Sequence, residues 1–259
     1  MRKSILFVLL GLLVSVTAFM ACGGDDEPSS GVTPQSSKLV AKIITEEGSS
    51  FYESSFTYDS QGRVIKVTET ESGTGTNSHS ETEYQYGEML IVSKMKGEGT
   101  YSNGQSFSRS ESHSYTLDNG RIVKDEEKQG SSLNSTSSSW TEIYSYDANN
   151  YLSSINTKML TWSDGNLIKL GDRSFEYSNY PWVKGLPLYL KGSNMDANLF
   201  AIGYYGNIPK NLPSKTIASE TSGYTYDYTF EGSYVTKVVI TPFVENNKSH
   251  KSISTIIWE

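Results

Sequence analysis

The chain has 259 residues, of which 36% are hydrophobic and 20% are charged, and its formal net charge is −7. That length suits one large domain or two small ones. The acidic balance argues against a nucleic-acid-binding protein, which needs a basic surface. One cysteine and three histidines are too few for a disulfide framework or a cysteine-rich metal site. We therefore expect an ordered domain that has no metal, no cofactor and no nucleic-acid partner.

The N-terminus carries the pattern of a secretory signal peptide. Arg2 and Lys3 precede an apolar run over residues 5–16, which is shorter than the stretch of about 20 residues that spans a bilayer. The single cysteine, Cys22, follows the sequence Phe-Met-Ala and resembles the lipid-attachment cysteine of a bacterial lipobox. We predict that residues 1–21 are a lipoprotein signal peptide and that Cys22 carries a lipid that anchors the domain to the membrane. The alternative is an ordinary signal peptide with a free thiol.

Residues 22–37 follow as a flexible acidic tether. Their Gly, Ser and Pro content leaves too few apolar side chains for a packed core. Asp25, Asp26 and Glu27 resemble the acidic tag that marks lipoproteins of Bacteroidetes for export to the cell surface. We therefore expect a protein that is lipid-anchored in the outer membrane and faces the cell surface. The remaining residues, 38–259, are expected to form a single β-sheet domain.

Polar and apolar residues alternate with a period of two throughout this domain. In the clearest case, Tyr224–Phe230, every second residue is aromatic. In a strand, such alternation places the aromatic side chains on one face and the polar ones on the other. About fourteen to sixteen strands of ordinary length fit the chain. The pattern predicts an all-β fold, a long antiparallel meander of hairpins that forms a strongly curved or rolled, barrel-like sheet.

Turn motifs separate the expected strands. Each pairs an Asp, which accepts hydrogen bonds from backbone N–H groups, with a Gly or Asn that adopts a positive φ. The turn-forming residues are Asp59 and Gly62, Asp118 and Gly120, Asp147 and Asn150, and Asp164 and Gly165. One Asp per turn offers too few oxygens for Ca²⁺, so we interpret these residues as turn caps. The Ser- and Thr-rich segments 70–83, 97–106 and 129–139 are expected to be exposed hairpin tips.

One region interrupts the hairpin pattern. Residues 178–212 contain several prolines, and residues 194–205 (NMDANLFAIGYY) are the best helix candidate. Asp196 is placed to cap the start of this helix. We expect a short helix or compact loop that plugs or caps one end of the sheet.

These motifs resemble two known groups of proteins. Residues 56–64 (FTYDSQGRV) are similar to the YD repeats of long secreted bacterial proteins, which wrap as a continuous antiparallel sheet. Residues 38–258 more closely resemble a Bacteroidetes lipoprotein family of unknown function, described as having a porin-like fold. The segments that carry this resemblance are Trp162–Leu167, Phe175–Tyr180, Asn211–Lys215 and Tyr224–Thr241. The resemblance implies a fold and no catalytic residues.

A barrel inserted in the membrane is the alternative to a rolled sheet outside it. A lipid anchor is redundant in a protein that already spans the bilayer. In an inserted barrel the aromatic face would have to meet lipid all round. The polar strand face is expected to carry Glu69, Glu71, Glu81, Glu83, Lys94 and Lys96. We favour a rolled sheet outside the bilayer, with the aromatic residues in its core.

The sequence contains no complete catalytic motif. His79, His113 and His250 stand apart in polar contexts, and we interpret each as a solvent-facing residue. Glu69 and Glu71 share a strand face, as the two acids of a glycosidase would, but alternating Glu is commoner on a solvated strand. We therefore predict no catalytic residues.

The surplus of tyrosine over phenylalanine, 18 against 9, is the feature that points to binding. Tyr and Trp rings stack on sugar faces. The candidate ligand-stacking residues are Trp140, Trp162 and Trp182, and the alternative is that these rings fill the core.

The leading hypothesis is a non-catalytic surface lipoprotein that binds a glycan, a lipid or an envelope protein. A structural scaffold that pairs through a sheet edge is the alternative, and a carbohydrate-active hydrolase comes third. An aromatic-lined cavity would favour binding, two convergent carboxylates would favour catalysis, and a fully packed core would favour a scaffold.

Replacing Cys22 by Ala should abolish the incorporation of radiolabelled palmitate, because the thiol is the expected attachment point. The measurement is metabolic labelling of cells that express either chain, followed by electrophoresis and autoradiography. The matched control is Ser29→Ala in the same tether, which should label like the wild type. Label that persists in Cys22→Ala, or that is absent from the wild type, would contradict lipid anchoring.

Overall fold

The segments in which polar and apolar residues alternate form strands throughout the part of the chain that the structure describes. The computed structural model describes residues 38–73, 75–132, 137–188, 195–244 and 250–259. The predictions for residues 1–37, including Cys22, Asp25, Asp26 and Glu27, lie outside the described residues.

The described residues contain sixteen strands and one short helix. The helix is α1 (Ala197–Ala201). The strands are β1 (Val40–Glu47), β2 (Ser50–Tyr58), β3 (Val64–Ser72), β4 (Thr76–Tyr86), β5 (Leu90–Tyr101), β6 (Ser106–Asp118), β7 (Arg121–Ser131), β8 (Ser137–Tyr146), β9 (Leu152–Ile155), β10 (Lys158–Ser163), β11 (Asn166–Leu170), β12 (Arg173–Pro181), β13 (Asn211–Ser219), β14 (Ser222–Glu231), β15 (Tyr234–Val244) and β16 (Ser252–Trp258).

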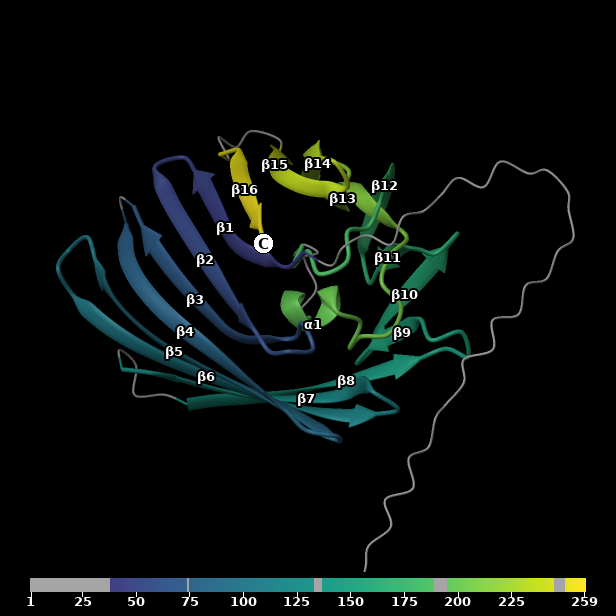
Figure 1. Cartoon of the computed structure of the whole chain (residues 1–259), viewed down its shortest axis with the longest axis horizontal. Helices are drawn as coiled ribbons and strands as arrows, with labels where there is room; N and C mark the ends of the chain where they lie inside the picture. The colour runs from purple at the N-terminus through teal and green to yellow at the C-terminus, as the bar shows by residue number, and fades with distance from the viewer. Residues whose placement is uncertain (1–37, 74, 133–136, 189–194, 245–249) are drawn as a thin grey trace, which may run out of the picture. The chain divides into compact units, whose positions relative to one another are not determined.

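Each strand pairs antiparallel with the next, and β1 pairs with β16 to close a barrel (Figure 1). The register joins Val40 to Trp258. Beyond it, the backbone N–H of Leu39 donates to the carbonyl of Glu259 over 2.8 Å, and the N–H of Glu259 donates back over 2.9 Å. The predicted all-β meander of hairpins is confirmed, and its ends meet.

Aromatic side chains seal one end of the barrel. In the described part of the chain, seven of the eight even-numbered strands carry, at or after their midpoint, a Tyr or Trp whose polar atom donates to a backbone carbonyl near the start of the preceding strand. Tyr58, for example, donates to the carbonyl of Val40 over 2.8 Å. We call this set the aromatic rim: Tyr58, Tyr86, Tyr146, Trp162, Tyr177, Tyr228 and Trp258. Because each bond satisfies two polar groups beside apolar neighbours, much of the tyrosine surplus is structural.

Two of the turns at this rim have the expected geometry. Asp59 accepts hydrogen bonds at Oδ1 from the N–H groups of Gln61 and Arg63, at 2.9 and 3.0 Å. Gly62 closes the turn at φ 74°. In the turn after β8, Asp147 accepts from two backbone N–H groups in the same way, and Asn150 takes the place of the glycine at φ 67°.

Two shorter turns differ from the expectation. Asn119 and Gly120 have φ of 51° and 76°, and Asp164 and Gly165 have φ of 50° and 79°. Positive φ at both central residues defines a two-residue type I′ hairpin, whose twist matches that of the strands. Asp164 therefore forms its turn through its own backbone conformation. Asp118 accepts from the side chain of Asn119 over 3.2 Å.

The short helix lies inside the barrel and is attached between β12 and β13 (Figure 1). Asp196 accepts at Oδ1 from the N–H groups of Asn198 and Leu199, at 2.8 and 3.2 Å, so the predicted cap is confirmed. Phe200 is buried, and its ring meets Trp182 edge-on at a centroid distance of 5.8 Å. Leu199 and Phe200 of the helix belong to the buried core cluster against which the aromatic rim packs.

The outer face of the barrel is charged. Ion pairs join neighbouring strands on this face at Lys42–Glu53 and Lys66–Glu81, both 2.7 Å long, and at Lys215–Glu176, 3.9 Å long. Tyr84, Tyr115 and Tyr226 are buried. The described residues include no helix that is long and apolar enough to cross a membrane.

The expected polar strand face was wrong in part. Glu69 pairs with buried Ser80 and shares the inner face with Glu71, whereas Glu81 and Glu83 lie on the outer face opposite Thr68 and Lys66. The Ser- and Thr-rich segments are also mainly strand and only partly hairpin tip, since β4, β5 and β7 run through them. Both errors have one cause: far from the rim the interior is polar, so these strands carry polar residues on both faces.

Replacing Gly223 in β14 by Ala should destabilise the barrel. A Cβ built there would collide with the carbonyl oxygen of Thr216 and the ring of Phe243. Overpacking of this kind costs about 1–3 kcal/mol, so the melting temperature should fall. Thermal unfolding followed by circular dichroism measures the change. The control is Gly75→Ala, whose Cβ would meet nothing within 4 Å; equal melting temperatures for the two variants would contradict the register of β13 and β14.

Candidate functional site: an acidic chamber inside the barrel

The interior away from the aromatic rim is hollow and acidic. Three adjoining cavities of about 270, 370 and 300 Å³ lie there, and Glu111 lines all of them. We call this space the acidic chamber. Its charged lining residues are Glu69, Arg109, Glu111, His113, Asp125, Glu127, Glu142 and Asp196. Six of these eight are carboxylic acids and two are basic.

The alternation of β6 explains how these residues reach the interior. Serine occupies every second position from Ser106 to Ser114, so the residues between the serines share the opposite face. The register with β7 then places His113 opposite Glu127 and Glu111 opposite Gln129. Two rows of charged side chains from neighbouring strands therefore meet inside the barrel.

His113 lies between carboxylates, and its side chain is only 15% exposed. Its Nδ1 is 2.9 Å from Asp125 Oδ2, and its Nε2 is 2.8 Å from Glu111 Oε1. Its ring stacks on Tyr115 at a centroid distance of 5.3 Å. Burial disfavours a charged ring, but the hydrogen bonds to Asp125 and Glu111 outweigh burial and raise the pKa of His113 to about 10.

The expectation that His113 faces solvent was therefore wrong. The serines that flank it are equally compatible with either face of a strand, so the local pattern gives no sign of which face is enclosed. Only the contact with β7 and the closure of the barrel decide that the ring points inward.

Gln129 connects the two glutamates beside His113. Its Nε2 donates to Glu111 Oε2 over 3.1 Å and to Glu127 Oε1 over 2.7 Å. The hydrogen bond from His113 lowers the pKa of Glu111 despite burial. Burial raises the pKa of Glu127. The two carboxyl groups therefore differ in proton affinity although they share one neighbour.

Asp196 connects the chamber to α1. Tyr84 donates its hydroxyl to Asp196 Oδ2 over 2.8 Å, and the side-chain amide of Asn198 donates to the same Tyr84 oxygen over 3.1 Å. Burial raises the pKa of Asp196, although the hydrogen bonds from Tyr84 and the backbone oppose the shift. Asp196 thus caps the helix with one oxygen and binds the barrel wall with the other.

Of the three tryptophans predicted to stack on a ligand, the structure places one at the chamber. Trp140 is 42% exposed and lines it beside Glu142. Trp162 belongs to the aromatic rim and donates to the carbonyl of Leu152 over 2.8 Å. Trp182 is buried against Phe200.

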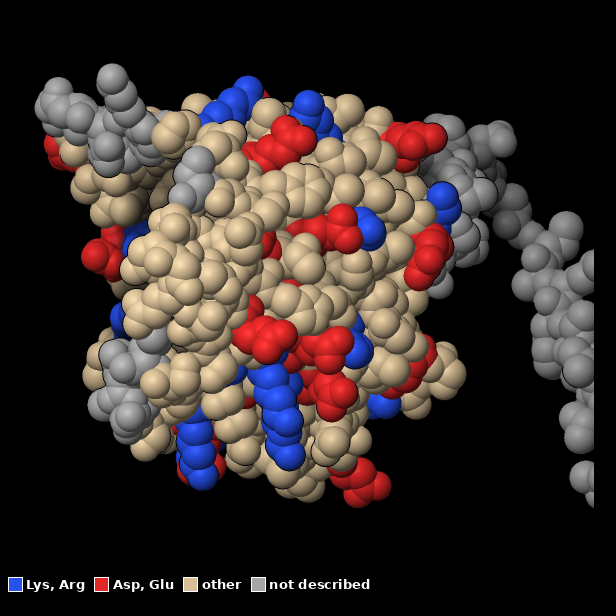
Figure 2. All heavy atoms as spheres, turned by 90° about the vertical axis from the view of Figure 1, so that its left-hand side faces the viewer, with Lys and Arg blue, Asp and Glu red and all other residues tan. Residues whose placement is uncertain are grey.

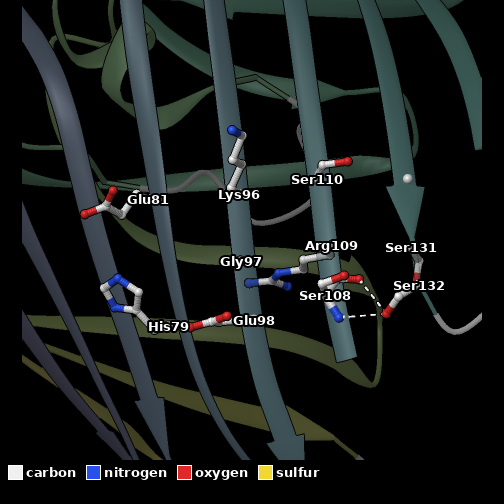
Figure 3. Close-up of a pocket in the computed structure, with 11 residues that line it drawn as sticks. His79, Glu81, Lys96, Gly97, Glu98, Ser108, Arg109, Ser110, Ser131 and Ser132 are labelled. Atoms are coloured by element: carbon white, nitrogen blue, oxygen red, sulfur yellow. Dashed lines mark hydrogen bonds between the residues drawn. The ribbon is translucent and has the colours of Figure 1, made fainter. Parts of the chain in front are cut away.

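A second cavity, of about 580 Å³, is a groove on the outer face of β4–β7 (Figure 3). It forms where Ser108, Ser110 and Gly130 present short or absent side chains outward. Its titratable lining residues are His79, Glu81, Lys96, Glu98 and Arg109, of which Arg109 also lines the acidic chamber. The two signs of charge are balanced there, and Glu81 already pairs with Lys66 over 2.7 Å. The excess of one charge inside the barrel makes the acidic chamber the stronger candidate site.

Figure 2 shows the side of the molecule that carries the hairpin tips between β1 and β6. Asp and Glu side chains gather near the middle of this face, with Lys and Arg side chains beside them. The surrounding surface is formed largely by uncharged residues. Charged side chains of both signs therefore lie together near the centre of this face.

Comparisons with known proteins bear on the fold. The model of a family described as a domain of unknown function (DUF4595) with porin-like fold matches residues 56–239. Among solved structures, the chain is similar to a porin-like protein from Bacteroides vulgatus at 13% identity, with a TM-score of 0.33, over 86% of this chain and 99% of that chain. No curated protein matches the chain.

The imidazole of His113 should remain protonated in the metal-free protein until the pH approaches 10. Its ring-proton resonances, followed by NMR in the presence of EDTA, should shift with a midpoint about 10 and not near the ordinary value of about 6.5. Because the folded-state pKa is the higher one, the stabilisation by charged His113 is complete below about pH 6.5 and is lost as the pH rises toward 10.

His113→Gln assigns the resonance and serves as the stability control. Between pH 6.5 and 9.5, wild-type protein should lose more thermal stability than this variant. A midpoint at or below the ordinary value, or parallel stability curves, would contradict the geometry around the ring.

Proposed function

The chain belongs to the family of domains of unknown function with a porin-like fold, and on that premise we propose that it is a non-catalytic lipoprotein whose barrel binds a small, polar, positively charged ligand. The observation that carries this proposal is the composition of the acidic chamber. Among the residues that the structure describes, six carboxyl side chains line it, and Arg109 and His113 are the basic side chains beside them.

The charge imbalance favours a cationic ligand. A carboxylate that is withdrawn from water without a counter-charge is costly. Asp125 and Glu111 share the single positive charge of His113. A ligand that brings a further ammonium or guanidinium group would offset that cost, and the low dielectric of an enclosed site would strengthen the attraction.

The other lining residues favour a ligand that also carries hydroxyl groups. Ser93, Thr82 and Gln129 offer hydrogen-bonding side chains, and Trp140 offers an aromatic face. Cavities of about 270–370 Å³ suit a molecule of monosaccharide size. An amino sugar combines these features. A lipid acyl chain does not, because it would leave the polar lining groups without partners.

Two features support the proposed location of the protein, the N-terminal sequence pattern and the charge on the outer surface of the barrel. Cys22 and the acidic residues after it support anchoring by lipid and display at the cell surface. The ion pairs on the outer face support a barrel that stands in water beside the membrane, since charged side chains on a lipid-facing strand are destabilising. The lipid is then the proposed contact with the outer membrane.

Glu111 and Glu127 supply the observation that favours glycoside hydrolysis as a second candidate. One carboxylate oxygen of each glutamate and one ring nitrogen of His113 lie within 4.8 Å of one another. The pKa of Glu111 is lowered and that of Glu127 is raised, and such opposite shifts are typical of an acid and base pair. Both carboxylates, however, already accept hydrogen bonds from Gln129. This static network favours binding. Release of nitrophenol from aryl-glycosides by the wild type, abolished in Glu127→Gln, would favour catalysis.

A scaffold that pairs through the ends of the sheet has less support. The first and last strands, β1 and β16, pair with each other over seven residue positions. A closed barrel offers no terminal strand to a partner.

Glucosamine should bind the purified protein more tightly than glucose, because the two sugars differ by one ammonium group. Isothermal titration calorimetry measures both affinities at low salt. Glu69→Gln removes one carboxylate from the chamber wall and should weaken glucosamine binding about tenfold, which corresponds to about 1.4 kcal/mol.

The matched control is Glu83→Gln, which makes the same substitution on the outer face of β4. It should leave the affinity unchanged. Equal binding of the two sugars, or equal effects of the two substitutions, would contradict a cation-binding chamber.

A further inference from the structure

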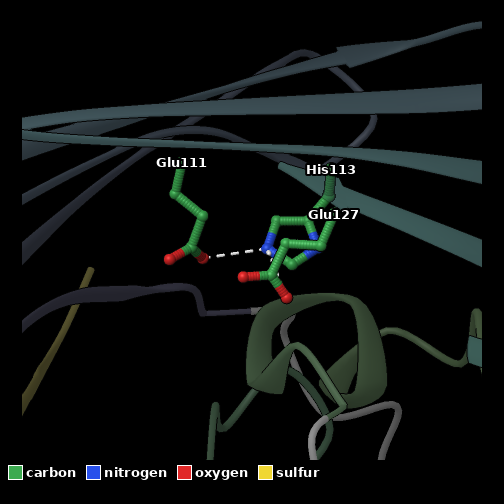
Figure 4. Close-up of side chains that lie close together, drawn as sticks. All are labelled: Glu111, His113 and Glu127. Carbon is green, nitrogen blue, oxygen red and sulfur yellow. Dashed lines mark hydrogen bonds and ion pairs between the residues drawn. The ribbon is translucent and has the colours of Figure 1, made fainter. Parts of the chain in front are cut away.

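Three side chains in the acidic chamber converge on one point (Figure 4). We propose that Glu111, His113 and Glu127 form a binding site for a divalent transition-metal ion of the Zn²⁺ type. One imidazole nitrogen with carboxylate oxygens is a donor set that such ions accept. The proposal rests on the chamber described above but not on its binding an organic ligand.

The spacing of the donor atoms is close to that of a metal site. The three ligand atoms all lie within 4.8 Å of one another. His113 Nε2 is 2.8 Å from Glu111 Oε1 and 3.9 Å from Glu127 Oε2. Tetrahedral zinc, with bonds of about 2.0–2.2 Å, places its ligand atoms about 3.3 Å apart. The two distances from Nε2 differ from that value by about 0.5 and 0.6 Å, and the two carboxylate oxygens would have to approach each other by at most about 1.5 Å.

Two residues outside the trio orient its donor atoms. Asp125 is buried and holds Nδ1 of His113 at 2.9 Å, which leaves Nε2 as the donor atom. A carboxylate behind the ligating imidazole is a regular feature of metal sites. Gln129 donates to Glu111 Oε2 and Glu127 Oε1, so the opposite oxygen of each carboxylate is the one that lies toward Nε2.

The carboxylates of Glu111 and Glu127 face His113 Nε2 from two different residues. Their negative charges attract a doubly charged ion more strongly than a singly charged one, because the Coulomb energy scales with the charge. All three residues line the cavity of about 370 Å³, which leaves room for a water molecule as a further ligand.

The test is a titration of the full chain with Zn²⁺ alone. Protein freed of metal with EDTA is studied by calorimetry at pH 7.5, and its metal content is measured after dialysis. We expect one zinc ion per chain. His113→Gln should reduce the affinity by at least tenfold, since even outer contacts of a metal ligand account for about 10–100-fold. The matched control is His79→Gln on the outer face, which should bind like the wild type.

A second variant keeps the test decisive if His113→Gln does not fold. Glu127→Gln preserves the shape of the side chain and should also weaken zinc binding, while circular dichroism confirms the β fold. Cobalt(II) gives an independent signal, because imidazole and carboxylate ligation produces visible absorption bands that His113→Gln should remove. Absence of zinc binding in the wild type, or equal binding in wild type and both variants, would overturn the proposal.

The zinc and glucosamine experiments separate the two proposals. Glu69→Gln should weaken the binding of glucosamine and leave zinc binding unchanged, because Glu69 is not among the three donors. Zinc binding without glucosamine binding would support the metal site and refute the organic ligand. Glucosamine binding without zinc binding would support the organic ligand and refute the metal site. The trio would then be a closed hydrogen-bond network around a charged histidine.

Discussion

The hydrogen bonds between β1 and β16 join the two ends of the sheet, and the remaining features of the described structure depend on this closure. A closed sheet separates an enclosed space from the surrounding water, so every second side chain of every strand must face the interior. Polar groups that are placed there must find partners within the barrel. In an open sheet, His113 and the carboxylates around it would be ordinary solvated residues on a polar strand face.

The barrel meets that requirement differently at its two ends. At the aromatic rim, Tyr and Trp side chains donate to backbone carbonyls while α1 supplies apolar packing. At the other end the wall residues bond to one another, as Gln129 does to Glu111 and Glu127. Asp196 belongs to both regions, since one of its oxygens caps the helix and the other accepts from Tyr84. The position of the helix and the shape of the chamber are therefore linked through one buried carboxyl group.

The barrel carries charged side chains both on its outer face and in the acidic chamber. Ion pairs such as Lys42–Glu53 and Lys66–Glu81 join neighbouring strands on its outer face. In its interior, several carboxylates surround one histidine. The ion pairs outside and the unbalanced charge inside support the proposed binding protein held beside a membrane. The proposed organic cation and the proposed metal ion draw on the same excess of negative charge.

The features that depend on neighbouring residues could be predicted from the amino-acid sequence. These were the period-two strands, the turns at Asp59 and Asp147, the cap at Asp196 and the likeness to a family with a porin-like fold. The pairing of the strands in space was needed to show which face of each polar strand is enclosed and which residues of β6 and β7 meet. The physical reason is that alternation distinguishes two faces without identifying the inner one when serines and charged residues occupy both. Register and closure, which bring Glu111, His113 and Glu127 together, are set by pairing between strands and not by the residues along either one.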